Sequence, residues 1–108
     1  MKTTLKILAA IAMMFPVAAQ AQQPTQAQID EYCGLLAEGA EGIMRSRQIG
    51  MPLSKALEIA AIPPALPAYR MMTLVAYELP VYHSDEAQER AAARFRDRMH
   101  LECLKAHQ

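Results

Sequence analysis

The sequence predicts an all-α fold: a small four-helix bundle, with three long helices and one short, closed by one disulfide between the first and last helices. Three observations predict it. Apolar residues recur at steps of three and four, which is the spacing of one helix face. Residues that start and stop helices divide the chain into segments. The two cysteines of the 108-residue chain, Cys33 and Cys103, lie toward opposite ends of the helical region.

The first residues have the pattern of an export signal. Lys2 and Lys6 give a positive start, an apolar run over residues 7–17 follows, and Ala19-Gln20-Ala21 fits a small-x-small cleavage site. The apolar run is shorter than the roughly 20 residues that cross a bilayer. We therefore predict a signal peptide over residues 1–21, cleaved after Ala21, and a single helical domain over residues 22–108 that is periplasmic or secreted.

The predicted mature chain is small and nearly neutral. Removing 21 of 108 residues leaves 87, with 9 basic and 11 acidic side chains and a net charge of −2. A nucleic-acid-binding domain normally has a strong basic excess, so that class of partner is not expected. The longest later apolar segment, residues 57–82, is interrupted by four prolines and three charged residues. We interpret it as core, and expect no stable membrane insertion after signal cleavage.

The first predicted helix begins after Thr25. Thr25 and Gln28 fit a capping box, in which each side chain binds the backbone N–H of the other residue. The helix should end near Gln48, with Gly50 just beyond as a terminator. Its apolar stripe consists of Ile29, Cys33, Leu36, Ala40 and Ile43.

Two shorter elements follow. Ser54 is the predicted cap of a short second helix over residues 55–61, which Pro63 and Pro64 stop. Pro67 suits the first turn of a third helix, where its missing N–H costs little, and Pro80 ends that helix.

The last predicted helix begins after Ser84. Asp85 and Glu86 occupy its first turn and Lys105 its last, in agreement with the helix dipole. Its apolar line consists of Ala91, Ala92, Phe95, Met99 and Cys103.

The cysteines predict how these helices are arranged. Two lone cysteines in an oxidising compartment normally pair. Cys33 lies near the start of the first helix and Cys103 near the end of the last, so a bridge makes those helices antiparallel neighbours. The middle helices are then expected to cover the open side of the pair.

Two groups of residues are candidates for binding a partner. Arg90, Arg94 and Arg98 recur at four-residue steps, a stripe that can dock an acidic surface. The alternative is a solvated face with local pairs such as Glu86–Arg90 and Arg94–Asp97.

Tyr77 and Tyr82 flank Pro80, and tyrosine beside a rigid turn is typical of interface anchors. The alternative is that both rings fill the open end of the bundle. If one contact surface is chosen, it is this turn together with the arginine stripe.

Metal and catalytic sites are not predicted. His100, Cys103 and His107 have a spacing that suits metal ligands on one side of a helix, but Cys103 is better placed in the disulfide. The serines lie in no nucleophile motif, and no glycine-rich phosphate loop is present. We expect no cofactor, no metal and no enzymatic activity.

Glycines inside the first helix have two interpretations. Gly34 and Gly42 lie off the apolar stripe, where the backbone of a partner or of a sister chain can approach closely. Simple tolerance of glycine in the helix is the alternative, and the sequence does not decide between them.

Short segments spread over the mature chain resemble a group of small uncharacterised exported proteins, helical with a single disulfide, from proteobacterial and bacteriophage genomes. The segments are Cys33, Ile43–Gln48, Ala76–Pro80, Phe95-Arg96 and Glu102-Cys103. The resemblance implies an exported bacterial or phage product and assigns no role to any residue.

These observations favour a periplasmic interaction module whose partner is another protein. Inhibition of an envelope protein or of a lysozyme-type enzyme is one form of that function. The alternative is a periplasmic chaperone of the acid-stress type, and a small metal-binding protein or enzyme is the least favoured.

Overall fold

Four helices make up the fold, as the sequence predicts, and a computed structural model describes residues 22–108. They are α1 (Gln26–Gln48), α2 (Leu53–Ala60), α3 (Pro67–Tyr77) and α4 (Asp85–Ala106). The helices α1 and α4 have 23 and 22 residues, whereas α2 has 8 and α3 has 11. The predicted signal peptide, residues 1–21, lies outside the described residues.

Local capping chemistry sets most helix ends. The Thr25 hydroxyl accepts a hydrogen bond from the Gln28 N–H, and the Gln28 side chain accepts one from the Thr25 N–H, so the predicted capping box is confirmed. Ser84 caps α4 by accepting a hydrogen bond from the Ala87 N–H. After α1, Gly50 has a φ of 88°, a left-handed conformation that glycine adopts without a steric penalty.

The start of α2 differs from the prediction. Ser54 does not cap this helix, because α2 already begins at Leu53 with Pro52 as the N-cap. The carbonyl of Pro52 accepts hydrogen bonds from the N–H groups of Lys55 and Ala56. The first turn of α2 is thus closed by hydrogen bonds to the Pro52 carbonyl, and Ser54 lies within the helix.

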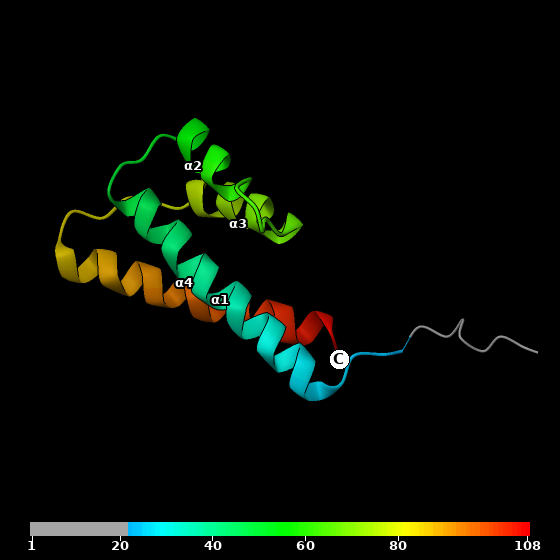
Figure 1. Ribbon diagram of the computed structural model, residues 1–108. Helices are drawn as coiled ribbons and strands as arrows, with labels where there is room; N and C mark the ends of the chain where they lie inside the picture. Colours follow the sequence, from blue (N-terminus) through cyan, green and yellow to red (C-terminus); the bar gives the residue numbers. More distant parts are fainter. Residues whose placement is uncertain (1–21) are drawn as a thin grey trace, which may run out of the picture.

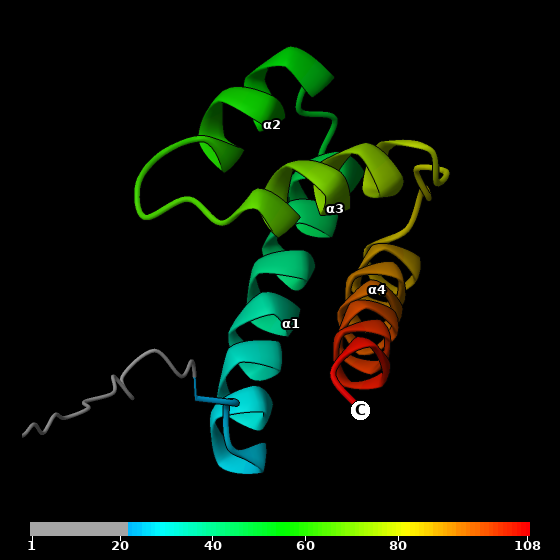
Figure 2. The ribbon, with the colours of Figure 1, turned by 90° about the vertical axis from the view of Figure 1, so that its right-hand side faces the viewer.

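The helices α1 and α4 run antiparallel and side by side (Figures 1 and 2). The shorter helices α2 and α3 lie together at the end of this pair where α1 finishes (Figure 2). The helix α3 packs mainly against α1. The helix α2 packs mainly against α3, so it forms an outer layer of the bundle.

The core runs along the seam between α1 and α4 and extends under α3. Residues of the apolar stripes predicted for the first and last helices make up most of this core. Its buried members are Cys33, Leu36, Ala40, Met44, Met72, Ala76, Ala92, Phe95 and Cys103.

None of the helices within residues 22–108 combines the length and the apolar composition needed to cross a bilayer.

Candidate functional site

A hollow of about 300 Å³ lies between the C-terminal half of α1, the α3–α4 linker (residues 78–84) and α4. We call it the arginine groove. Its apolar lining consists of Met44, Leu79, Pro80, Ala87, Ala91 and Phe95. Its polar lining consists of Gln48, Tyr82, Arg90, Arg94 and Arg98. Four of the five residues proposed from sequence as partner-binding therefore line one hollow.

Helical spacing puts the arginines at the outer edge of this groove. An α-helix turns by about 100° per residue, so residues four apart climb one side of it. Arg90, Arg94 and Arg98 follow this spacing and are exposed, and we call them the arginine stripe. Phe95 is turned inward and only 2% exposed, so it forms an apolar floor beside the charges.

No ion pair within residues 22–108 involves the arginine stripe. The local pairs Glu86–Arg90 and Arg94–Asp97, which the sequence offered as the alternative, are not formed. Asp97 instead contacts its neighbour Arg96, with 3.2 Å between Arg96 Nε and Asp97 Oδ1. The stripe therefore presents three guanidinium groups to solvent without an acid from its own described chain.

Two other acids, Glu41 and Glu89, pair with arginines and join α1 to α4 in a separate cluster. Glu41 contacts Arg45 at 2.7 Å and Arg96 at 3.3 Å, and Arg45 also contacts Glu89. The hydrogen bond from Arg45, together with the charges of Arg45 and Arg96, holds the pKa of Glu41 below its ordinary value. Hydrogen bonds to Glu89 and Glu41 raise the pKa of Arg45. We call Glu41, Arg45, Glu89 and Arg96 the charged cluster.

Side chains from α1 and α4 fix the path of the α3–α4 linker. The Gln48 amide donates to the Pro80 carbonyl at 2.9 Å and accepts from the Tyr82 N–H at 2.8 Å. Gln88 donates to the Tyr82 carbonyl at 2.8 Å, and Arg47 donates to the Leu79 carbonyl at 3.0 Å. Gln48 itself is 4% exposed, so its two bonds to the linker are partly shielded from competing water. The backbone that carries Tyr82 is therefore held in place from both sides.

The two predicted tyrosines lie in different environments. Tyr82 is 41% exposed and lines the arginine groove. Tyr77 is half-buried, and its hydroxyl donates to the Met51 carbonyl at 2.7 Å. The guanidinium of Arg47 lies 5.1 Å from the centre of the Tyr77 ring, and burial raises the pKa of this phenol. Tyr77 therefore ties α3 to the α1–α2 turn, and the structure does not bring it into the groove.

Sequence reasoning missed the groove residue Gln48. Gln48 lies in the last turn of α1, where a polar residue is normally expected to face solvent. Its hydrogen-bond partners are more than 30 positions away in the chain. Phe95 was predicted only as part of the apolar line of the last helix. The sequence signal for Gln48 is faint: it is a polar residue four positions after buried Met44.

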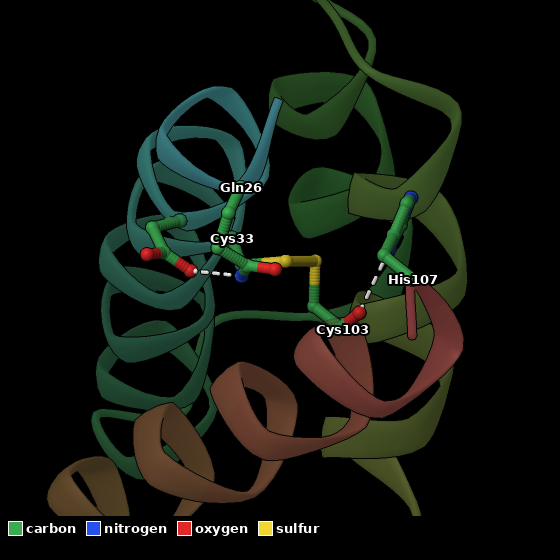
Figure 3. The surroundings of a disulfide bond; sticks show 5 residues. Gln26, Cys33, Cys103 and His107 are labelled. Carbon is green, nitrogen blue, oxygen red and sulfur yellow. Dashed lines mark hydrogen bonds between the residues drawn. A yellow bond between two sulfur atoms is a disulfide. The ribbon is translucent and has the colours of Figure 1, made fainter. Parts of the chain in front are cut away.

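The predicted disulfide joins Cys33 of α1 to Cys103 of α4, with 5.5 Å between the two Cα atoms (Figure 3). His107 lies beside it, and its Nδ1 donates to the Cys103 carbonyl at 2.8 Å. The sulfur atoms and a ring nitrogen of His107 come within 4.8 Å of one another, whereas His100 does not join this group. Both sulfur atoms are bonded to each other, so neither acts as a metal ligand in this state.

A second hollow of about 360 Å³ lies between α1, α2 and α3. Its lining is mainly apolar and includes Ile43, Met51 and Ile59, with Gly39 and Gly42 from α1. Gly39 is the α1 glycine that a neighbour approaches, because a Cβ there would lie 2.7 Å from Tyr69 Cε1. Nothing in the described chain comes within 4 Å of a Cβ built on Gly34 or Gly42.

Comparison of this chain with protein-family models, with curated proteins and with solved structures finds no match, so the candidate site rests on its own geometry.

Proposed function

We propose that this protein is an exported protein-binding module, acting in the periplasm or outside the cell, and that the arginine groove is its contact surface. One observation carries the proposal: the arginine stripe lines a preformed hollow and has no acidic partner within the described chain. Arginine and tyrosine are enriched among residues that dominate binding energy, and Tyr82 lies in the same hollow.

The fixed linker supports this function. Binding costs free energy when loops must be ordered at the interface, and a preorganised surface avoids part of that cost. Gln48 and Gln88 together occupy both backbone hydrogen-bonding groups of Tyr82. The groove is thus shaped before a partner arrives.

A bait experiment with a charge-matched control tests the proposal. The full chain, expressed for export and purified in its processed, oxidised form, is immobilised and exposed to periplasmic extract. A partner should be retained saturably by the wild type and lost in R90Q/R94Q/R98Q. The control K55Q/R70Q/K105Q removes three exposed cations outside the groove and should retain it. Equal capture by both triple variants, or none by the wild type, contradicts the proposal.

Lysozyme-type enzymes are the first defined partner class to examine. The purified protein should slow cell-wall digestion by such an enzyme if its role is inhibition, and the same pair of triple variants assigns the effect to the groove. An unchanged digestion rate at saturating protein removes this class and leaves other envelope proteins.

A second candidate function is that of an acid-stress chaperone. The observation that favours it is a set of exposed apolar side chains on and between α2 and α3: Leu53, Ile59, Ile62, Met71 and Leu74. Protonation of Glu41 weakens the charged cluster that joins α1 to α4, so acid can add apolar side chains from the α1–α4 seam to this exposed set. A client protein should then aggregate less in its presence at acid pH. Equal aggregation with and without it excludes this function.

A further inference from the structure

We propose that the arginine groove binds an extended acidic segment of its partner, one in which glutamate or aspartate alternates with apolar residues. This inference rests on the proposed function and adds to it the chemistry of the partner.

The charge distribution selects an acidic segment. The arginine stripe holds 3 of the 9 basic residues that follow residue 21, and the remaining positions hold 6 basic against 11 acidic residues. A local positive edge on a chain that is otherwise acidic attracts negative groups to that edge and repels them elsewhere. Guanidinium groups bind carboxylates in a planar, two-bond geometry, which favours carboxylates over diffuse negative charge.

The contrast with the charged cluster strengthens this selection. There, Arg45 and Arg96 each contact acids of α1 or α4. The chain therefore supplies carboxylates to Arg45 of α1 and Arg96 of α4, and leaves the arginines of the stripe without them.

Spacing favours an extended segment. Residues four apart on a helix rise by about 6 Å, so the stripe spans about 12 Å from Arg90 to Arg98. Alternate residues of an extended chain are about 6.6 Å apart and lie on the same side. Three acids at alternate positions therefore match the three arginines in register.

The hollow of about 300 Å³ has room for a few side chains of such a segment. Residues between the acids then point toward the opposite, apolar side of the groove, formed by Met44 and Leu79.

A peptide experiment tests this occupant directly. The probe is a labelled seven-residue peptide that alternates valine with glutamate and begins and ends with valine, so that it carries three glutamates; its matched control replaces each glutamate by glutamine. Fluorescence anisotropy with the processed, oxidised protein measures both affinities. We expect the acidic peptide to bind about tenfold more tightly at low salt, because three exposed ion pairs each contribute modestly. Raising the salt from about 50 to 300 mM should remove most of that difference.

The arginine variants assign the binding to the groove. R90Q/R94Q/R98Q should lose the preference for the acidic peptide, and K55Q/R70Q/K105Q should keep it. Equal affinity for both peptides overturns the inference, as does the same loss in both variants. Full displacement of the acidic peptide by inorganic phosphate at equal concentration also overturns the inference, because the groove would then bind any anion and not a peptide segment.

The outcomes separate this inference from the proposed function. Groove-dependent capture of a protein combined with equal binding of the two peptides removes the inference and keeps the function. A strong acidic preference without any captured protein keeps the inference and removes the function. Sedimentation showing that the stripe mediates self-association also overturns the inference, because the occupant is then a second copy of this chain.

Discussion

Gln48 is the single residue on which the shape of the arginine groove depends most. Its amide uses both ends at once: the nitrogen donates to Pro80, and the oxygen accepts from Tyr82. The nitrogen also lies 3.4 Å from the sulfur of Met44, so the side chain is surrounded by groove residues. A buried amide held in this way positions the backbone around it as well as contributing packing.

Replacing Gln48 by alanine should lower the free energy of unfolding by about 2 kcal/mol, because the partly buried Pro80 carbonyl and Tyr82 N–H lose their partner. Urea denaturation at neutral pH measures the change. Gln88→Ala removes an exposed hydrogen bond to the Tyr82 carbonyl and should cost less than about 1 kcal/mol. An equal cost for the two variants would show that Gln48 has no special role.

Glu41 makes the pairing of α1 and α4 sensitive to acid. Because its pKa is lowered in the folded state, its contribution to stability is complete above its ordinary pKa. As the pH falls through the lowered pKa, the unfolded chain has already bound the proton and the contribution is lost.

Glu41→Gln should therefore flatten the fall in melting temperature between neutral pH and about pH 3, since it removes a carboxylate whose pKa folding lowers. Thermal melts followed by circular dichroism at several pH values measure this. Glu38→Gln is the control, because Glu38 is an exposed acid of the same helix. An unchanged pH profile in Glu41→Gln would assign the acid sensitivity to other groups.

At the scale of the elements, α1 combines three glycines with different surroundings. Glycine in a helix interior costs about 1 kcal/mol relative to alanine. For Gly34 and Gly42 the described chain offers open space, whereas the ring of Tyr69 lies against Gly39. The close approach therefore comes from α3 of the same molecule, at the one glycine of the three that the sequence did not single out.

Gly34→Ala should raise the free energy of unfolding by about 1 kcal/mol, because it improves helix propensity without a new contact. Gly39→Ala gains the same propensity but forces the Tyr69 ring to move, so it should be less stable than Gly34→Ala. Guanidinium denaturation of the two variants side by side gives the order. The reverse order would show that the Tyr69 ring of α3 can move without lowering the free energy of unfolding.

Local chemistry explains which element boundaries could be predicted. The ends at Thr25, Ser84 and Gly50 were predictable because each is decided within a few residues. The prediction of Ser54 as the cap of α2 was wrong, because the carbonyl of Pro52 accepts the first hydrogen bonds of this helix.

The candidate site was predictable only in part. The arginine spacing showed that three cations share one side of α4, and the cysteines showed which helices pair. The roles of Gln48 and Glu89 could not be foreseen, because each contacts residues more than 30 positions away. Asp97 was assigned to Arg94 because of its spacing, yet it contacts the adjacent Arg96.

At the scale of the whole molecule, the disulfide lies toward one end of the α1–α4 pair and most of the arginine groove lies toward the other, with Arg98 as the groove residue nearest to Cys103 in sequence. Cys33 lies near the start of α1, whereas the groove begins at Met44 and Gln48 near its end. About 15 residues of helix, roughly 22 Å, separate Cys33 from Gln48. The bridge is therefore expected to hold the fold together without shaping the groove.

Removing the bridge with C33A/C103A should lower the free energy of unfolding by about 4 kcal/mol, because the two cysteines are 70 positions apart and the cross-link restricts the unfolded chain. Affinity for the acidic peptide should stay within about twofold at a temperature where the variant is folded. Peptide titration at low temperature, with circular dichroism confirming helix content, measures both. A large loss of affinity in the folded variant would show that the bridge also controls the groove.

The position of the two ends of the domain has a practical consequence. Thr25 and Gln108 both lie at the bridge end of the molecule, and the C-terminus comes close to the start of α1 (Figure 1). A fusion partner, surface anchor or affinity tag attached at either end is thus displayed away from Tyr82 and the arginine stripe. A group attached there leaves Tyr82, at the other end of α4, free of the attachment.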